Sequence, residues 1–285
     1  LGVNPDEVKQ INQIPYLPIE FFKQENVVCK PNNIDTVFTS SGTSGMESKH
    51  IIHDIGIYEK SFTSGFEYFY GNIKDYTVLA LLPSYIERSG SSLIYMCEKL
   101  IKHSGKKESG FYLNDHKELK DLLLELECQN QKTLLIGVSF ALIDFVEKHP
   151  VGLKNTIVME TGGMKGKRKE MHKQEVHSIL KKSFSIEKIH SEYSMTELLS
   201  QAYSKGENIF KSPAWMKILI RDINDPLSII GCNKTGAINI IDLANIYSCP
   251  FIATEDCGQL YNDNSFSVIG RLSETDIRGC NLLIA

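Results

Sequence analysis

The segment Ser40–Lys49, SSGTSGMESK, combines residue types that bind phosphate and follows a β-branched run. Its glycines let the backbone approach an anion closely, and its hydroxyls and N–H groups can donate to phosphate oxygens. The spacing GxxxxGK[ST] of one common nucleotide-binding loop is absent, and a Ser/Gly-rich segment is equally typical of an ordinary loop. An anion-binding loop and a plain connection therefore both remain open here.

A second motif, Glu160–Gly166 (ETGGMKG), comes directly after the buried strand expected at Thr156–Met159. Paired glycines at a strand end suit a flat ligand lying on the backbone, with Gly162 and Gly163 as the contact points. Lys165 would add a cation nearby. A tight turn explains the same glycines, so this motif also has an ordinary alternative.

A third motif, YSMTE, spans Tyr193–Glu197 and follows the strand expected at Ile186–Ile189. A hydroxyl beside a carboxylate at a strand end could hold phosphate and Mg²⁺. The alternative is a helix start, because Ser194 followed by Glu197 is a capping-box pattern.

Two motifs near the end of the sequence offer a carboxylate and an arginine. Thr254–Asp256 (TED) leads to Gly258, and Asp256 could accept hydrogen bonds from both ribose hydroxyls or cap an ordinary turn. Arg271 closes a strand pattern, a position that is commonly a surface ion pair. The stretch Asp276–Cys280 (DIRGC) follows.

Alternating strand and helix patterns from residue 54 to residue 189 must position these motifs. Unbroken apolar strands between amphipathic helices predict a parallel sheet covered on both faces, with ligands at the carboxyl ends of the strands. The segments that end at Ser40, Leu82, Met159 and Ile189 are expected to meet on one rim. After Trp215, short strands separated by turn residues predict an antiparallel or barrel-like section.

Composition and charge exclude several classes of protein. The 285 residues are 42% hydrophobic and 23% charged, which is typical of a folded globular chain and not of a disordered or fibrous one. A net charge of −4 gives no electrostatic case for nucleic acid as a partner. No window is apolar enough for a membrane span.

Seven scattered cysteines include no CxxC pair and no zinc-ligand spacing. Reduced thiols in a cytoplasmic protein are therefore expected.

The order of these motifs resembles the adenylate-forming superfamily, and within it the LuxE acyl-protein synthetase branch. The resemblance rests on IPYLPIEFFK, SSGTSG, LPSYIERSGSSLIYM, TGGMKG, EYSMTEL and IRGCNLL, and it extends from about residue 14 to residue 283. It implies an α/β nucleotide-binding part over residues 1–210 and a small β-rich closing part over 211–285, within one adenylate-forming domain. The mobile C-terminal lid domain is expected to be absent, because the family's catalytic lysine has no counterpart here.

The resemblance also implies a role for each motif. The serines and glycines of the first loop would wrap the β- and γ-phosphates of ATP, the paired glycines would line the adenine pocket, and Tyr193 would pack on the base. Thr196 would touch the α-phosphate, and Glu197 would hold Mg²⁺. Asp256 would bind the ribose, and Arg271 would reach the ribose or stabilise a closed form. The first-loop residues are Ser40, Ser41, Gly42, Thr43, Ser44 and Gly45.

The sequence departs from the family pattern in ways that bear on mechanism. Ser44 replaces a threonine, and Ser194 replaces a glycine. Lys165 or Arg88 is the candidate to replace the lid lysine. The branch resemblance offers a cysteine near the C-terminus as acyl acceptor, and Cys280 is the one in the last twenty-five residues.

The resulting hypothesis is a ligase that activates a carboxylic acid, on the branch resemblance a fatty acid, as acyl-AMP with ATP and Mg²⁺, and transfers the acyl group to a thiol. An acyl-accepting protein or reductase is the implied partner. Two alternatives stay open: a phenylacetate-CoA-ligase-like or amide- or ester-forming ligase with a separate acceptor, and a nucleotide-binding module without catalysis.

Overall fold

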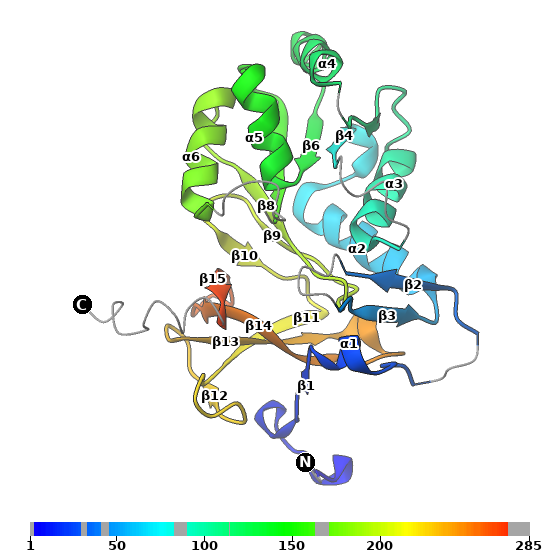
Figure 1. The fold of residues 1–285 in the computed structure, drawn as a ribbon, viewed down its shortest axis with the longest axis vertical. Coiled ribbons are helices and arrows are strands. Elements are labelled where there is room, and N and C mark those ends of the chain that lie inside the picture. Colours follow the sequence, from blue (N-terminus) through cyan, green and yellow to red (C-terminus); the bar gives the residue numbers. More distant parts are fainter. Residues whose placement is uncertain are drawn as a thin grey trace.

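The computed structural model describes residues 3–29, 33–40, 46–82, 90–113, 115–162 and 171–272. Within them, thirteen strands form one mixed sheet and two more form a separate hairpin (Figure 1). The strands of the sheet follow the order β12-β11-β13-β14-β15-β10-β9-β8-β7-β6-β4-β5, with β1 paired to β14.

The bounds of the strands are β1 (Leu17–Pro18), β2 (Thr36–Thr39), β3 (Lys49–Ile52), β4 (Thr77–Leu81), β5 (Gly110–Phe111), β6 (Thr133–Gly137), β7 (Thr156–Thr161), β8 (His190–Tyr193), β9 (Ala202–Ser204), β10 (Ile209–Lys211), β11 (Met216–Arg221), β12 (Ile229–Ile230), β13 (Thr235–Asp242), β14 (Phe251–Leu260) and β15 (Phe266–Arg271). The helices are α1 (Phe21–Gln24), α2 (Ile55–Tyr70), α3 (Ser92–Ser104), α4 (His116–Cys128), α5 (Ser139–Lys148) and α6 (Lys173–Phe184), with a short 3₁₀ turn, η4, at Leu243–Asn245.

The parallel half of the sheet confirms the expected α/β arrangement. Strands β5, β4, β6, β7 and β8 run parallel, and every residue of β4 and β6 is buried. Helices α5 and α6 cover one face while α2 and α3 cover the other (Figure 1). Unbroken apolar strands are stable here because both faces are covered.

Local capping fixes where three of the helices begin. The side chain of Asp54 accepts a hydrogen bond from Gly56 N (2.9 Å) at α2, and Asp115 accepts one from Glu118 N (3.0 Å) at α4. Ser91 caps α3 in the same way. Each cap satisfies a backbone donor that the helix itself leaves unpaired, so the sequence signal and the observed start agree.

Two strands differ from their predicted bounds. The strand expected at Ile186–Ile189 is β8 at His190–Tyr193, because Ser185 adopts a left-handed conformation and Ile186 N donates back to Lys181 O (3.1 Å) to close α6. The first residue of the apolar run, Ile186, therefore belongs to the C-terminal cap of α6 and not to the strand. Strand β7 extends through Thr161, so Glu160 lies in the strand and not in the loop after it.

The β-rich section after Trp215 is present as expected, but it joins the parallel half without a break. Strands β9, β10 and β15 link β8 to β14, and β13 and β11 continue antiparallel from β14 (Figure 1). Thr254–Asp256 lies inside β14. The turn alternative for that motif is therefore wrong.

The Ser/Gly motif occupies an unexpected place. Strand β2, which leads into it, pairs antiparallel with β3 in a hairpin and not with the parallel sheet. The expectation that Ser40 ends a strand of the main sheet is wrong, because hydrogen bonding between β2 and β3 satisfies both strands locally. The described ends of the motif, Ser40 and residues 46–49, therefore belong to this hairpin and its approach.

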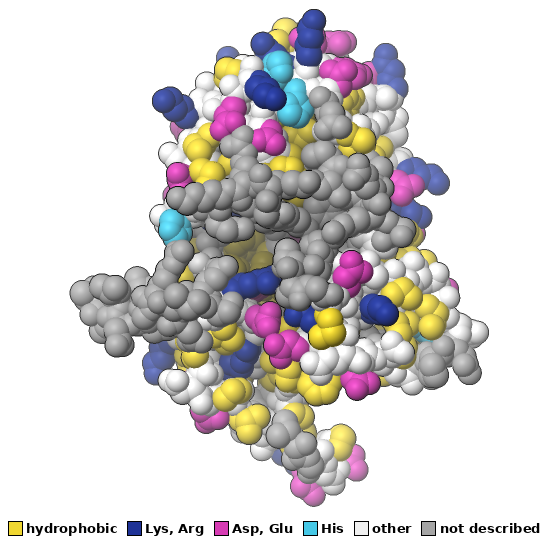
Figure 2. All heavy atoms as spheres, viewed as in Figure 1, with side chains coloured by type: hydrophobic (Ala, Val, Ile, Leu, Met, Phe, Trp, Pro, Cys, Tyr) yellow, Lys and Arg dark blue, Asp and Glu magenta, His cyan; other side chains and the backbone are white. Residues whose placement is uncertain are grey.

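Two apolar cores support this architecture, one between the parallel strands and their helices and one within the antiparallel section. On the face drawn in Figure 2, acidic and basic side chains of the described residues are interspersed. The helices in the described part of the chain are all too short or too polar to cross a bilayer.

Candidate active site

Three residues from separate motifs meet where β8 approaches β14 and β15. The Tyr193 hydroxyl donates to Asp256 Oδ2 (2.7 Å), and Arg271 Nε lies 3.9 Å from Asp256 Oδ1. Asp256 and Arg271 are also register partners on neighbouring strands. The tyrosine ring packs against Phe210 and Phe266, and burial raises the pKa of Tyr193 well above its usual value. Tyr193 thus orients the Asp256 carboxylate.

Glu197 is a nearly buried carboxylate close to this group. Its side chain is 6% exposed, and burial raises its pKa, opposed by a hydrogen bond from Ser48 and by the positive charges of Lys23 and Arg271. No helix begins at Ser194, since residues 194–200 contain only a turn at Thr196 and Glu197 and otherwise have no regular structure. The capping-box alternative is therefore wrong, and Glu197 is held by tertiary contacts.

Side chains from three other elements hold the segment that contains Thr196 and Glu197. His50 on β3 hydrogen-bonds the Thr196 carbonyl (2.9 Å), and Asn245 in η4 donates to the Glu197 carbonyl (2.8 Å). Asp242, at the end of β13, accepts from Leu199 N and Ser200 N (both 2.9 Å). We call residues 196–200 the clamped segment. These side-chain contacts satisfy backbone groups that would otherwise be hydrogen-bonded within a strand or helix.

The β2–β3 hairpin brings one end of the Ser/Gly motif to Glu197. Ser40 N donates to Ser48 O (3.0 Å), and Ser48 N donates to Ser40 Oγ (2.8 Å). The Ser48 hydroxyl in turn hydrogen-bonds Glu197. Ser48 therefore links Ser40 to the Glu197 carboxylate through hydrogen bonds.

Gly162 lies just past the end of β7, with no described atom within 4 Å of the position that a Cβ would take. Among the described residues, nothing blocks a flat ligand from resting on the backbone here. The other predicted site residues lie outside the described residues; they are Ser41, Gly42, Thr43, Ser44, Gly45, Gly163, Lys165 and Cys280. Arg88 lies outside them as well.

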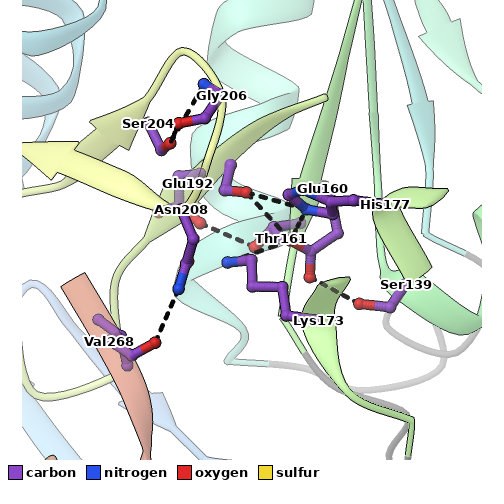
Figure 3. Close-up of polar contacts among 11 residues, drawn as sticks. Ser139, Glu160, Thr161, Lys173, His177, Glu192, Ser204, Gly206, Asn208 and Val268 are labelled. Atoms are coloured by element: carbon purple, nitrogen blue, oxygen red, sulfur yellow. Dashed lines mark hydrogen bonds and ion pairs between the residues drawn. The ribbon is translucent and has the colours of Figure 1, made fainter. Parts of the chain in front are cut away.

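A buried polar cluster around Glu160 adjoins the ends of β7 and β8 and was not predicted (Figure 3). Ser139 Oγ donates to Glu160 Oε1 (2.6 Å), while Lys173 Nζ lies 3.3 Å and His177 Nε2 3.6 Å from Oε2. Burial opposes ionisation of Glu160, but the cations and hydrogen bonds outweigh it and lower its pKa to about 2. Glu160 is thus an ionised, fully paired carboxylate.

Glu192, on the neighbouring strand, has a different environment. Thr161 Oγ1 donates to Glu192 Oε2 (2.7 Å), but Oε1 is buried without a hydrogen-bond partner among the described residues. Burial, with the nearby charge of Glu160, raises its pKa. The signal in the sequence is a glutamate within each of two buried strands, Glu160 in β7 and Glu192 in β8.

The donor set fits a magnesium ion that arrives with a phosphate ligand. In the described part of the chain, no group of three or more His, Cys, Asp or Glu side chains is arranged for a metal. Mg²⁺ commonly uses one or two carboxylates and completes its shell with phosphate oxygens and water. The single carboxylate of Glu197 is therefore enough protein ligand for such an ion.

Comparison with family models and with curated proteins finds no match. Solved structures do share the fold. ATP-bound MatB from Rhodopseudomonas palustris superimposes with a TM-score of 0.64 at 13% identity, over 85% of this chain and 49% of that one. A 2-hydroxyisobutyryl-CoA ligase in its postadenylation state gives 0.65 at 12% identity, over 95% and 62%.

McyG A-PCP complexed with phenylalanyl-adenylate gives a TM-score of 0.60 at 14% identity, over 94% of this chain and 49% of that one. The chain thus spans between about half and three fifths of the length of these structures. The first contains ATP, the second is in a postadenylation state and the third contains an aminoacyl-adenylate. The described chain has the α/β fold of the adenylate-forming enzymes.

Proposed function

We propose that this protein uses ATP to activate a carboxylic acid as an acyl-adenylate. The observation that carries the proposal is the meeting of Tyr193, Asp256 and Arg271 beside the clamped segment with Glu197. Motifs that are separate in the sequence supply a carboxylate for ribose, a carboxylate for a metal and a cation at the carboxyl end of β8. The shared fold supports this role.

The reaction needs positioning and charge neutralisation more than proton transfer. An oxygen of the substrate carboxylate attacks the α-phosphorus of ATP, the bond to the pyrophosphate oxygen breaks, and pyrophosphate leaves with its electron pair. Two anions must approach, so nearby cations and hydrogen-bond donors have to offset their repulsion. Arg271 and Lys23, whose charges reach Glu197, contribute to that field.

In this proposal each motif residue has one task. Asp256, oriented by Tyr193, accepts hydrogen bonds from the ribose hydroxyls, and Thr196 donates to the α-phosphate. Glu197 holds Mg²⁺, which neutralises phosphate charge when bound. The open surface at Gly162 receives the adenine, and Ser40 belongs to the loop for the terminal phosphates.

The finer proposal is that the acid is a fatty acid and that the acyl group passes to a thiol, with Cys280 as acceptor and a reductase as partner. It rests on the sequence resemblance to the acyl-protein synthetases. A separate acceptor such as a soluble thiol or amine is the second candidate, supported by the fold shared with a CoA ligase. A module that binds nucleotide without catalysis is the third.

Exchange of labelled pyrophosphate into ATP, with a panel of carboxylic acids, tests the proposal. Exchange that depends on one acid supports activation, while its absence with ATP binding intact favours the non-catalytic module. Glu197→Gln keeps the shape of the side chain and removes the charge that holds the metal. We expect its exchange rate to fall at least ~10²-fold, the scale of lost electrostatic stabilisation in other active sites.

Glu59→Gln is the matched control, because Glu59 pairs with Lys99 between α2 and α3 and lies in no site motif. It should exchange at the parental rate. Parental exchange and parental Mg²⁺ dependence in folded Glu197→Gln would overturn the assignment of Glu197.

A further inference from the structure

His50 connects the hairpin that carries the Ser/Gly motif with the segment that carries Thr196 and Glu197. It lies in β3, 1% exposed, and both ring nitrogens are engaged. Nδ1 is 2.9 Å from the Thr196 carbonyl oxygen, and Nε2 is 3.0 Å from Ser248 Oγ. None of the sequence motifs included this residue as a functional one.

The two hydrogen bonds define the state of the ring. A carbonyl oxygen only accepts, so Nδ1 carries the proton and donates to Thr196, and Nε2 accepts from the Ser248 hydroxyl. Burial lowers the pKa of His50 to about 4, so the ring is neutral at physiological pH. The edge-to-face contact with Phe22 (centroids 5.4 Å apart) restricts its rotation.

The clamped segment needs such a contact because it has no regular structure of its own. Asn245 and Asp242 fix its carbonyl at Glu197 and its amides at Leu199 and Ser200. Within the described residues, hydrogen bonds of His50 and Ser48 tie it to the β2–β3 hairpin. Ser48 acts on the Glu197 side chain, whereas His50 acts on the backbone just before it.

We propose that His50 is a positioning residue of the adenylation site, which sets the Thr196–Glu197 backbone relative to the β2–β3 hairpin. The inference rests on the proposed function. The groups for the α-phosphate and metal lie on one side of this bond, and the hairpin that leads into the phosphate motif lies on the other. A misplacement of about 1 Å can cost ~10²-fold in rate, so one bond of this kind can govern the chemistry.

Three substitutions of His50 distinguish the effect of its hydrogen bond to Thr196 from the effect of its packing. In His50→Asn the amide nitrogen can take the place of Nδ1 and still donate to Thr196. In His50→Gln the amide reaches instead toward the place of Nε2, and in His50→Phe both bonds are lost while the ring volume is kept. His190→Asn is the matched control, since His190 also has its pKa lowered to about 4 by burial but bonds the Tyr70 hydroxyl (3.1 Å).

We expect pyrophosphate exchange in His50→Phe and His50→Gln to lose ~10- to 10²-fold in kcat, with a raised Mg²⁺ requirement and little change in KM for the acid. His50→Asn should retain most of the rate, and His190→Asn all of it. Hydrogen–deuterium exchange should show faster exchange at residues 196–200 in His50→Phe than in His50→Asn.

Each outcome decides one question. If the parent exchanges pyrophosphate and folded His50→Phe matches it in kcat and Mg²⁺ dependence, the positioning role is overturned and the proposed function stands. Equal losses in His50→Asn and His50→Phe, with equal protection of the clamped segment, would also overturn it. If the parent shows no exchange with any acid, the proposed function fails and the catalytic role of His50 fails with it.

Discussion

At the scale of single residues, the buried carboxylates near the ends of β7 and β8 divide into two kinds. Glu160 is ionised at ordinary pH, because Lys173, His177 and Ser139 outweigh its burial. Burial raises the pKa values of Glu192 and Glu197, because it outweighs the hydrogen bonds and cations near each of them. If Glu197 holds Mg²⁺ as proposed, a proton competes with the metal for its carboxylate, and Mg²⁺ binding should strengthen as pH rises.

His50 provides a pH prediction. Its pKa is about 4 in the folded chain and near 6.5 in the unfolded chain, so protons bind the unfolded state first as pH falls. This contribution to stability is complete above pH 6.5 and declines progressively toward pH 4, by up to about 3 kcal/mol. His50→Asn should remove that part of the pH dependence. Urea unfolding at pH 7.5, 5.5 and 4.5 measures it.

The pH dependence of stability must be compared between His50→Asn and the parent, because other buried groups also change stability with pH. The raised pKa values of Glu192, Glu197 and Asp242 add stability as pH falls, whereas Glu160 loses its contribution only between about pH 4.5 and pH 2. Parallel pH profiles for His50→Asn and the parent would contradict the assignment of a neutral buried ring.

At the scale of elements, β14 shows how a strand irregularity positions a site residue. The register between β14 and β15 shifts between Cys257 and Gly258, directly after Asp256. A Cβ on Gly258 would lie 2.2 Å from the Ser267 carbonyl oxygen, so only glycine fits this approach of the two backbones. The bulge thus sets the pairing of Asp256 with Arg271.

Two glycine substitutions should consequently both weaken ATP binding but differ in their effect on stability. Gly258→Ala should lower stability by about 1–3 kcal/mol through overpacking and weaken ATP binding by moving Asp256. Gly162→Ala meets no described atom and should keep its Tm, yet weaken ATP binding because the methyl group would enter the adenine surface. Thermal unfolding and calorimetric titration with ATP distinguish them. Unchanged ATP affinity in Gly162→Ala would remove Gly162 from the site.

At the scale of the whole molecule, adenylation and acyl transfer are separate questions. The described residues include Tyr193, Glu197, Asp256 and Arg271 of the proposed nucleotide site, whereas the proposed acceptor, Cys280, lies outside them. The solved structures that share the fold include a 2-hydroxyisobutyryl-CoA ligase and a complex with phenylalanyl-adenylate, so the fold by itself specifies neither the acid nor the acceptor. The acceptor has to be identified chemically.

Intact-protein mass spectrometry after incubation with ATP, Mg²⁺ and the activated acid tests the acceptor. The parent should gain a hydroxylamine-labile acyl mass, because a thiolate attacks the adenylate carbonyl and expels AMP. Cys280→Ser should still release pyrophosphate but gain no such mass. Cys232→Ser, which removes an exposed free thiol, should acylate normally. Acylation of Cys280→Ser at the parental level would favour a separate acceptor.

The sequence by itself predicted most of the elements and the residue types of the proposed site. Apolar runs such as β4 and β6 and caps such as Asp54 and Asp115 are local signals, because hydrogen bonds and side-chain periodicity act over a few residues. Local patterns of the same kind indicated Tyr193, Glu197 and Asp256 as candidate functional residues.

Only the tertiary structure decided how these groups meet. Strand β2 pairs with β3 outside the main sheet, and His50 bonds a carbonyl 146 positions away. The charge state of Glu160 depends on Lys173 and His177, which reach it from α6. Such contacts leave no periodic signal in the sequence, because pairing energy and desolvation depend on which distant segments pack together.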